Sequence, residues 1–287
     1  MPTPMQLTEQ EFEHFAKLVQ ERAGITLVPA KRTLLSNRLR ARLKARGLDS
    51  FAEYAQQMRN PRFAEDELPH FLSTVTTNET HFFRNPRLWE LFNTKMIPAF
   101  RNGRPSATKR IKVWSAASSS GEEAYTVAIA LAEAFGLDSG WQVQIVGSDI
   151  SQRVLDKAQA ARYGEYAVAK MDTARRTRWF NRIDDEYEVK PELRKMVRFM
   201  THDLRRPFPL RGFNLVLLRN VLMYFDNDTK RQALETCVQA VAPEGFLFVG
   251  DVDPIRTTPE LTAAVPYKSE APGLYRHTTN AATTTGK

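Results

Sequence analysis

The sequence predicts an α/β protein in which an all-helical N-terminal domain precedes a doubly wound, mostly parallel sheet. Two observations carry this prediction: apolar residues recur at helical spacing up to about residue 75, and apolar strands then alternate with helices. The 287 residues leave room for about two domains, each with its own core. We expect domains at 1–75 and 91–278, a linker at 76–90 and a disordered tail at 279–287.

Helix signals define the first domain. Thr8 and Glu11 have the spacing of a capping box, which predicts a first helix. Shorter helical patterns occur at 51–58 and 65–75. Between the first helix and these patterns, leucines at every fourth position predict a second helix that ends at Gly47: Leu35, Leu39 and Leu43.

Positive charge is concentrated in this second helix. No acidic residue occurs between Arg22 and Leu48, while seven lysines and arginines lie within 31–46. They supply much of the net charge of +8, which indicates an anionic partner of a kind that composition does not identify. A solvated helix face is the simpler alternative, but seven cations without an acid repel one another and favour a partner.

After the linker, buried strands alternate with crossover helices. Strands are predicted at 111–116, 143–148, 213–218 and 246–249, with an edge strand at 273–277. The predicted helices occupy 121–135, 151–161 and 226–241. Within 175–201, alternating apolar residues predict a small antiparallel excursion from the main sheet: Tyr187, Val189, Val197 and Phe199.

Several classes of protein are excluded. The longest stretch without a charged residue, 68–78, is too short and too polar to cross a membrane, and the N-terminus has no signal-peptide pattern. The single cysteine, Cys237, forms neither an internal disulfide nor a thiolate metal site, as is typical of a reducing compartment. We expect a cytoplasmic protein without membrane insertion.

Candidate functional residues follow the predicted strands, because ligands of open parallel sheets lie at the carboxyl ends of the strands. Small residues at 115–121 precede two carboxylates, Glu122 and Glu123, at a helix start. Asp149 ends the second strand, where the ribose hydroxyls of an adenosine would lie. The third strand is followed by three further candidates: Arg219, Asn220 and Tyr224.

These residues favour a cationic nucleoside over a dinucleotide. The Gly-x-Gly-x-x-Gly pattern is missing, and Glu122 and Glu123 would repel a pyrophosphate. A nucleoside with positive charge and no phosphate fits, and S-adenosylmethionine is such a molecule. Simpler interpretations exist, since first-turn carboxylates stabilise helices and an aspartate such as Asp149 caps turns. The occurrence of all three at successive strand ends favours a ligand site.

Five segments carry a resemblance to a known family: TNETHFFR at 77–84, VWSAASSSGEE at 113–123, SDI at 148–150, RNVLMYF at 219–225 and PEGFLF at 243–248. In this order they resemble the chemotaxis receptor methyltransferases (CheR), which are S-adenosylmethionine-dependent protein-glutamate O-methyltransferases. The resemblance runs from about residue 7 to residue 276. It implies a helical receptor-recognition domain followed by a Rossmann-like methyltransferase domain with a small antiparallel β-subdomain.

The resemblance also implies roles for individual residues. Arg84 is the implied partner of the cofactor carboxylate, Glu122 of its positively charged end and Asp149 of its ribose hydroxyls. Tyr224 is implied to lie close to the methyl acceptor, and a looser motif places Arg101 there. The full implied cofactor set is Asn78, Thr80, Arg84, Glu122, Asp149, Asp203, Leu204, Arg219 and Asn220.

The implied chemistry agrees with what the sequence lacks. A glutamate carboxyl has a pKa of about 4.3, so at neutral pH it is already a nucleophilic carboxylate and needs no general base. Attack on a sulfonium methyl group disperses charge, so we expect positioning in a dry site to supply most of the catalysis. The five histidines have no ligand spacing, and no metal is expected.

The implied partner is the acidic methylation region of a chemoreceptor's cytoplasmic helical bundle. Arg38, Arg42 and Arg46 form the stripe expected to lie along its glutamates. Some members bind a tethering pentapeptide through a glycine-bearing loop, but 180–190 (FNRIDDEYEVK) has no glycine, so we expect no such requirement. We expect a monomer that binds no nucleic acid.

Two alternatives stay open at this point. The cofactor site does not specify the acceptor, so a methyltransferase for another anionic partner, RNA included, fits the same residues. The second alternative is a non-catalytic signalling or nucleic-acid-binding module with a vestigial cofactor site, which the basic helix alone permits. The intact set of candidate residues argues against such a module.

Overall fold

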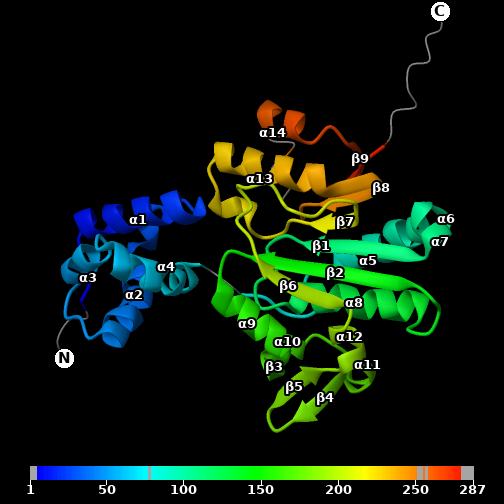
Figure 1. Cartoon of the computed structure of the whole chain (residues 1–287), viewed down its shortest axis with the longest axis horizontal. Helices are drawn as coiled ribbons and strands as arrows, with labels where there is room; N and C mark the ends of the chain where they lie inside the picture. The colour runs from blue at the N-terminus through cyan, green and yellow to red at the C-terminus, as the bar shows by residue number, and fades with distance from the viewer. Residues whose placement is uncertain (1–4, 77–78, 251–254, 256–257, 279–287) are drawn as a thin grey trace, which may run out of the picture.

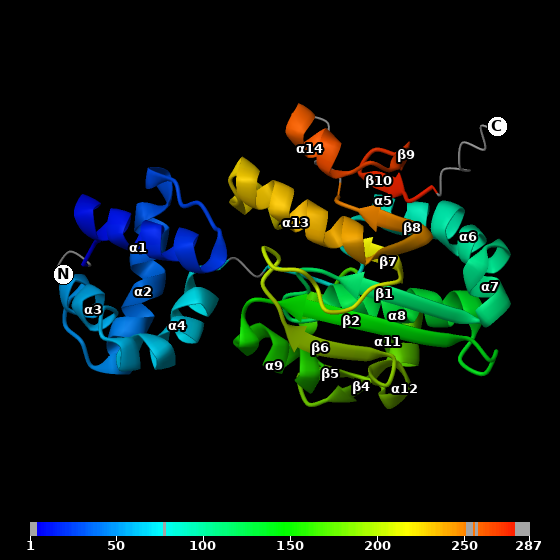
Figure 2. The ribbon, with the colours of Figure 1, turned by 45° about the horizontal axis from the view of Figure 1, so that its top comes forward.

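A helical domain, a sheet domain and a small subdomain make up the structure, a computed structural model that describes residues 5–76, 79–250, 255 and 258–278. Figure 1 shows the helical domain beside the sheet domain, and Figure 2 shows the same arrangement from a second direction. The expected tail at 279–287 lies outside the described residues. The α/β fold class, with helices first and a mostly parallel sheet after them, is confirmed.

Within residues 5–76 the helical domain consists of α1 (Glu9–Ala23), η1 (Pro29–Lys31), α2 (Arg32–Arg46), α3 (Phe51–Gln57) and α4 (Pro61–Val75). The predicted capping box of Thr8 and Glu11 begins α1. Helix α4 begins earlier than predicted because Asn60 caps it and Pro61 occupies its first turn, where a missing N–H is no loss. The centre of the domain is an aromatic cluster: Phe15, Tyr54 and Phe71.

The sheet domain is built on seven described strands in the order β6-β2-β1-β7-β8-β10-β9. The parallel strands are β1 (Arg110–Ser115), β2 (Gln142–Asp149), β6 (Val197–Thr201), β7 (Phe213–Leu217) and β8 (Val241–Phe248). Strands β9 (Lys268–Ala271) and β10 (Leu274–Arg276) complete one edge in antiparallel pairing. The strand order reverses between β1 and β7, so a ligand crevice is expected at their carboxyl ends.

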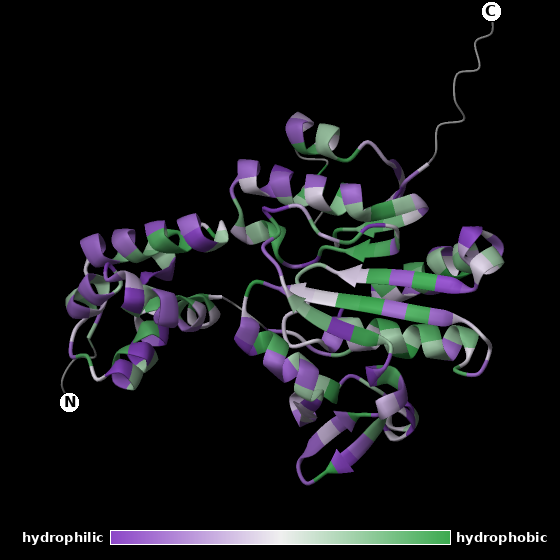
Figure 3. Cartoon of the chain, viewed as in Figure 1, coloured by the Kyte–Doolittle hydropathy of each residue, from purple (hydrophilic) through white to green (hydrophobic). Residues whose placement is uncertain are grey.

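Helices cover both faces of this sheet (Figure 2). One face carries the predicted crossover helices α8 (Glu122–Phe135) and α9 (Gln152–Ala160), and the other carries α13 (Asn227–Ala240) and α14 (Pro259–Ala264). Figure 3 shows hydrophobic residues concentrated on the central strands and on α8. The short elements between α4 and β1 were not predicted: α5 (Pro86–Leu91), η2 (Phe92–Met96), α6 (Ile97–Asn102) and α7 (Arg104–Thr108).

A three-stranded antiparallel sheet in the order β3-β5-β4 forms the subdomain. It comprises β3 (Arg162–Gly164), α10 (Glu165–Val168), α11 (Thr173–Trp179), β4 (Phe180–Ile183), β5 (Glu186–Val189) and α12 (Pro191–Arg194). The predicted excursion is confirmed for Tyr187 and Val189 but is wrong for Val197 and Phe199. These two residues lie in β6, which pairs in parallel with β2 at the edge of the main sheet. Alternation indicates a strand, but it does not indicate which sheet the strand joins.

The helical domain is fastened to the sheet domain at the end of α1. The Thr26 N–H donates to the Tyr224 carbonyl at 2.7 Å, and Ile25 forms a β-bridge with Phe225. The Arg205 guanidinium donates to the carbonyl groups of Glu21 at 2.9 Å and Arg22 at 2.7 Å, which end α1. The buried apolar residues of the helical domain and of the α13 face form one continuous core.

Candidate active site

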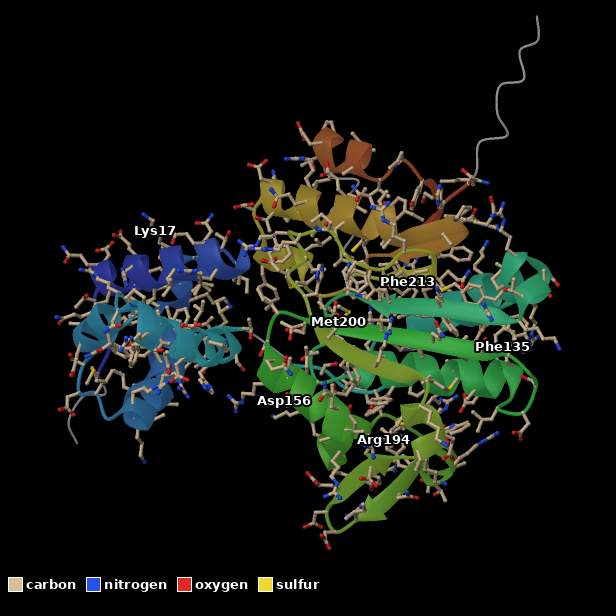
Figure 4. All side chains as sticks on the ribbon, viewed as in Figure 1. Lys17, Phe135, Asp156, Arg194, Met200 and Phe213 are labelled. Carbon is tan, nitrogen blue, oxygen red and sulfur yellow. The ribbon has the colours of Figure 1, made fainter. Side chains whose placement is uncertain are left out.

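A cavity of about 520 Å³ lies at the carboxyl ends of the central strands, and residues of both domains line it. Figure 4 shows this end of the sheet: Met200 of β6 lies beside the helical domain, and Phe135 lies at the opposite end of the sheet. The volume is typical of sites for small organic ligands. Most of the candidate residues are in its lining: Thr80, Arg84, Asp149, Asp203, Leu204, Arg219, Asn220 and Tyr224.

Backbone amides hold Asp149 at the end of β2. Its carboxylate accepts hydrogen bonds from the N–H groups of Ser119 and Ser151, both at 3.0 Å. Burial raises the pKa of Asp149, and these hydrogen bonds oppose the rise only in part. Small side chains in the loop after β1 allow this close approach. A carboxylate fixed in the lining can accept hydrogen bonds from a diol.

Glu123 and Arg219 form an ion pair in the cavity lining. The distance between Arg219 Nη1 and Glu123 Oε2 is 2.7 Å, and the two side chains are 5% and 13% exposed. The Ser115 hydroxyl donates to Glu123 Oε1 at 2.6 Å. Arg219 Nε is buried without a hydrogen-bond partner among the described residues. Because little water reaches this pair, charged groups of a ligand interact strongly with it.

Glu122 does not occupy the position implied for it. Its carboxylate is buried and accepts a hydrogen bond from the Ser120 hydroxyl at 2.8 Å, and the described lining contains Glu123 instead. Burial raises the pKa of Glu122. Successive residues of a helix point roughly 100° apart, so only one of two neighbouring carboxylates can face the cavity. The carboxylate available to a cationic ligand is therefore that of Glu123.

Arg84 reaches the cavity from the segment between α4 and α5. Its Nη1 donates to the Glu79 carbonyl at 2.7 Å. The residues on either side, Phe83 and Asn85, have φ angles of 52° and 69°, in the left-handed region that side chains disfavour. Such conformations persist where surrounding contacts determine the backbone, as they often do at functional sites. The strained backbone on either side fixes the direction in which the Arg84 side chain points.

Asp203 lines the cavity in the loop that follows β6. Burial alone would raise its pKa, but hydrogen bonds and the charge of Arg205 outweigh burial and lower the pKa of Asp203. The neighbouring His202 also lines the cavity and packs edge-on against Phe208, with ring centres 4.8 Å apart. Burial lowers the pKa of His202, which disfavours the protonated ring. No sequence pattern distinguishes His202 from the other four histidines.

The other implied cofactor residues are placed as follows. Thr80 and Leu204 are in the cavity lining, as is Asn220, whose backbone is left-handed with φ 55°. Tyr224 lies in η3 (Leu222–Tyr224) and also lines the cavity. Asn78 lies outside the described residues.

The expected position of Arg101 is wrong. Its guanidinium in α6 donates to the Ala134 carbonyl at 2.6 Å and lies over the Phe135 ring, 5.5 Å from its centre. Figure 4 shows Phe135 far from the helical domain. The unpredicted helices α6 and α7 lead the chain to the amino end of β1, so Arg101 lies at the opposite end of the sheet from the cavity.

The arginines of the basic stripe expected on α2, Arg38, Arg42 and Arg46, form hydrogen bonds within the helical domain. Arg42 donates twice to the Glu67 carboxylate, both times at 2.8 Å, and Arg46 and the Tyr54 hydroxyl donate to the same group. The Glu67 side chain is fully buried, so these arginines neutralise a charge inside the domain. Arg38 donates to the carbonyl group that ends α4, at 2.7 Å, and lines the cavity. The periodicity of α2 could not indicate these partners, because they lie in other helices.

The helical domain supplies one wall of the cavity, which was not expected from the sequence. The residues of this wall come from the segment after α1 and from the start of α2: Ile25, Thr26, Leu27, Val28, Lys31 and Leu34. No local pattern predicts them, because the wall exists only where two domains meet.

The described residues contain no group of three or more His, Cys, Asp or Glu side chains that could hold a metal ion. Among the helices that the structure describes, none is long and apolar enough to cross a membrane.

Both domains match one protein family. Residues 78–270 match the family described as CheR methyltransferase, SAM binding domain, and residues 10–76 match the CheR methyltransferase, all-alpha domain. The chemotaxis protein methyltransferase of Salmonella typhimurium LT2 is 34% identical over 258 residues, 87% of this chain and 85% of that protein. Its counterpart in Escherichia coli K12 is 32% identical over 257 residues, 87% of this chain and 86% of that protein. A third relative, from Borreliella burgdorferi, is 30% identical over 265 residues, 91% of this chain and 93% of that protein.

The described cavity fits S-adenosylmethionine, the methyl donor of this family. Asp149 can accept from a diol, Glu123 can face a sulfonium, and Arg84 can bind a carboxylate. The match covers both domains in order and nearly the full length of each relative. The chain therefore belongs to the CheR methyltransferase family.

Proposed function

We propose that this chain transfers the methyl group of S-adenosylmethionine to glutamate side chains of chemoreceptors, and that the resulting glutamyl methyl esters set adaptation in bacterial chemotaxis. One observation carries the proposal: a single cavity, walled by both domains, offers Asp149, Glu123 and Arg84 to three chemically different ends of the cofactor. The relatives named above are chemotaxis protein methyltransferases, which supports the same activity.

Each end of the cofactor has a matching residue in this proposal. Asp149 accepts from the ribose hydroxyls, and Arg84 binds the carboxylate through two parallel hydrogen bonds. Glu123 attracts the sulfonium, in the role first given to Glu122. The remaining residues flank the adenine or complete the pocket: Asp203, Leu204, Asn78, Thr80, Arg219 and Asn220.

For this reaction the protein has to orient the two reactants and stabilise their charges. S-adenosylmethionine supplies an electrophilic methyl group when bound. The acceptor carboxylate is ionised at neutral pH, and its oxygen forms the new O–C bond as the C–S bond breaks, which leaves two neutral products. No proton moves, so His202 is not needed as a base. Tyr224, in the lining, can orient the acceptor oxygen through its hydroxyl group, and the burial of Arg219 and Glu123 supports a site from which water is excluded.

The proposed acceptor is the cytoplasmic helical bundle of a chemoreceptor, which a monomer of this chain meets through its helical domain in the cytoplasm. Exposed cations of that domain, Lys31, Arg32 and Lys44, support an acidic partner. The turn between β4 and β5, with Asp184 and Asp185, has no glycine, which supports docking without a tethering pentapeptide. Neither nucleic acid nor membrane insertion is part of the proposal.

Calorimetric titration with S-adenosylmethionine and S-adenosylhomocysteine tests the cofactor site. The wild-type chain is expected to bind both, and Asp149→Ala is expected to weaken binding by roughly tenfold or more, because hydrogen bonds to a charged group are lost. Asp138→Ala is the matched control, since this exposed carboxylate lies in the loop before β2, at the other end of the strand. A folded wild-type chain that binds neither compound would refute the proposal.

Methyl transfer to purified cytoplasmic fragments of chemoreceptors tests the acceptor. A glutamyl methyl ester releases methanol in mild base, so base-labile label from methyl-labelled cofactor is the expected product. Fragments whose methylated glutamates are replaced by alanine should accept no label. Label that enters RNA instead, or that stays on the protein after base treatment, would contradict the proposed acceptor.

A further inference from the structure

Three exposed apolar side chains line the cavity, and their exposure places them where it opens to solvent. Among the described residues, six large hydrophobic side chains are exposed, and three of them line the cavity: Val28 (50% exposed), Leu34 (40%) and Met223 (60%). Exposed apolar groups are ordinary when scattered, but a group of them around one opening marks an interaction site. We name Val28, Leu34 and Met223 the apolar rim.

The rim comes from three separate segments. Val28 follows α1, Leu34 lies in the first turn of α2, and Met223 lies in η3 next to Tyr224. The hydrogen bond from the Thr26 N–H to the Tyr224 carbonyl, 2.7 Å long, holds the first and third segments together. The rim therefore exists only when the two domains are docked, and it borders the residue proposed to contact the acceptor.

Charge around the rim favours an acidic partner. On the helical side, Lys31 and Arg38 line the same cavity, and Arg32 is exposed beside them. Two described carboxylates of the lining are paired with arginines, Glu123 with Arg219 and Asp203 with Arg205, while Glu79 accepts from the neutral Tyr166 hydroxyl and Asp149 from backbone amides. All four belong to the linker or the sheet domain. The helical side of the opening thus combines apolar surface with positive charge.

We propose that the apolar rim docks an acidic amphipathic helix of the receptor, and that it contacts apolar side chains one helical turn on either side of the acceptor glutamate. This inference rests on the proposed function. In a helix, residues three and four positions apart lie on one face, about 5–6 Å apart. A glutamate can then extend into the cavity while its apolar neighbours rest on Val28, Leu34 and Met223. The rim would thus select which glutamates of a receptor are methylated.

Steady-state kinetics of the triple variant Val28→Ser, Leu34→Ser, Met223→Ser test the rim. We expect the KM for a receptor fragment to rise by roughly tenfold or more, because apolar contacts with the acceptor are lost. The KM for the receptor fragment should rise more than the Kd for S-adenosylhomocysteine, as expected when the variant weakens binding of the acceptor more than binding of the cofactor. Leu137→Ser is the matched control: Leu137 is 42% exposed, lies outside the cavity lining and should leave the KM unchanged.

A second measurement uses helical acceptor peptides. Replacement of the apolar residues one turn from the glutamate by serine should raise the wild-type KM as the triple variant does. When the triple variant is combined with the serine-substituted peptide, the KM should be little higher than with either change alone, because both changes remove the same contact.

Several outcomes would overturn the inference. It fails if the triple variant keeps the wild-type KM, or if Leu137→Ser raises the KM as much. It also fails if the triple variant loses binding to anionic phospholipid vesicles, or loses self-association in sedimentation, while its receptor KM stays unchanged. A wild-type chain that binds S-adenosylhomocysteine but methylates no receptor fragment refutes the proposed acceptor, and the rim would fall with it.

Discussion

Arg205 and Asp203 form a doubly hydrogen-bonded pair, with Nη2 to Oδ2 at 2.7 Å and Nε to Oδ1 at 3.0 Å. The same guanidinium donates to the carbonyl groups of Glu21 and Arg22, where α1 ends. Cations are favourable at a helix C-terminus, so Arg205 stabilises the end of α1 as well as the carboxylate. Because Asp203 lines the cavity, one side chain connects the cofactor site with the helical domain.

Replacement of Arg205 by alanine should uncouple these two regions. Coupling between sites is reciprocal, so if the docked helical domain favours cofactor binding, the cofactor also protects the docked interface. We expect Arg205→Ala to weaken S-adenosylhomocysteine binding by about fivefold or more. Hydrogen exchange at the Thr26 amide should slow with ligand in the wild type and hardly change in the variant. Arg206→Ala, at an exposed neighbour outside the lining, is the control, and equal effects of both variants would contradict the coupling.

Glu67 makes the helical domain sensitive to acid. Burial alone would raise its pKa, but hydrogen bonds from Arg42, Tyr54 and Arg46 outweigh burial and lower the pKa of Glu67 to about 2. A carboxyl with a depressed pKa stabilises the fold above its unfolded pKa, near 4.5, and loses this contribution as the pH falls toward 2.

Glu67→Gln should therefore lower the free energy of unfolding by about 3 kcal/mol at pH 7, since each pKa unit corresponds to about 1.4 kcal/mol. The difference from wild type should shrink between pH 4.5 and pH 2, as measured by urea unfolding across this range. Glu65→Gln changes an exposed carboxylate of the same helix and should have almost no effect at any pH. A Glu67→Gln difference that stays constant with pH would show that ionisation of Glu67 is not the cause.

Long amphipathic segments could be predicted from the sequence because one face of each is buried throughout. Helices α1, α2 and α8 and strands β1 and β2 are of this kind. The short helices α5 to α7 were missed because six residues or fewer contain too little periodicity to distinguish a helix from a loop. The alternation of β6 was found, but its place in the main sheet depends on pairing with the distant β2.

The site was predictable to the extent that it follows strand ends. Asp149, Arg219 and Asn220 lie in the cavity because parallel strands end at one edge of the sheet. The choice between Glu122 and Glu123 depends on the rotation of α8 about its axis, which its packing on the sheet determines. The wall from the helical domain depends on contacts between domains, such as that of Thr26 with Tyr224, which no local pattern contains.

Glu122 and Glu123 should differ in their effect on the two forms of the cofactor. S-adenosylmethionine carries a positive sulfonium, whereas S-adenosylhomocysteine is neutral at its sulfur. Glu123→Gln leaves the positive charge of Arg219 without its partner in the lining, so it should weaken S-adenosylmethionine binding by about tenfold more than S-adenosylhomocysteine binding. Glu122→Gln should leave the ratio of the two Kd values unchanged, as measured by calorimetry.

The raised pKa of Glu122 allows a second measurement that distinguishes Glu122 from Glu123, the pH dependence of thermal stability. A buried carboxyl with a raised pKa lowers stability as the pH rises above its unfolded pKa, near 4.5, because folding then requires uptake of a proton or burial of the charge. Glu122→Gln should therefore unfold at a higher temperature than wild type at pH 7 and gain nothing near pH 4. If Glu122→Gln instead weakens S-adenosylmethionine selectively, Glu122 and not Glu123 faces the sulfonium.

Alanine substitutions at two glycines that end helices allow the effect of backbone strain to be distinguished from the effect of contact between the domains. Gly24 and Gly47 end α1 and α2 with φ angles of 71° and 65°, so alanine at either position costs about 1 kcal/mol in backbone strain. A Cβ at Gly47 would meet nothing within 4 Å, whereas a Cβ at Gly24 would lie 2.7 Å from Thr229 Cγ2 and 3.1 Å from Arg205 Cδ.

Gly24→Ala should therefore lower the free energy of unfolding by about 2–4 kcal/mol, because overpacking adds to the strain, and Gly47→Ala by about 1 kcal/mol. Denaturant unfolding measures both values. The contact with Arg205 also predicts that Gly24→Ala alone weakens S-adenosylhomocysteine binding, because displacement of α1 releases the guanidinium that holds Asp203. If both variants lose the same stability and keep wild-type affinity, the end of α1 can move without disturbing the cavity, and Arg205 does not connect the helical domain to the cofactor.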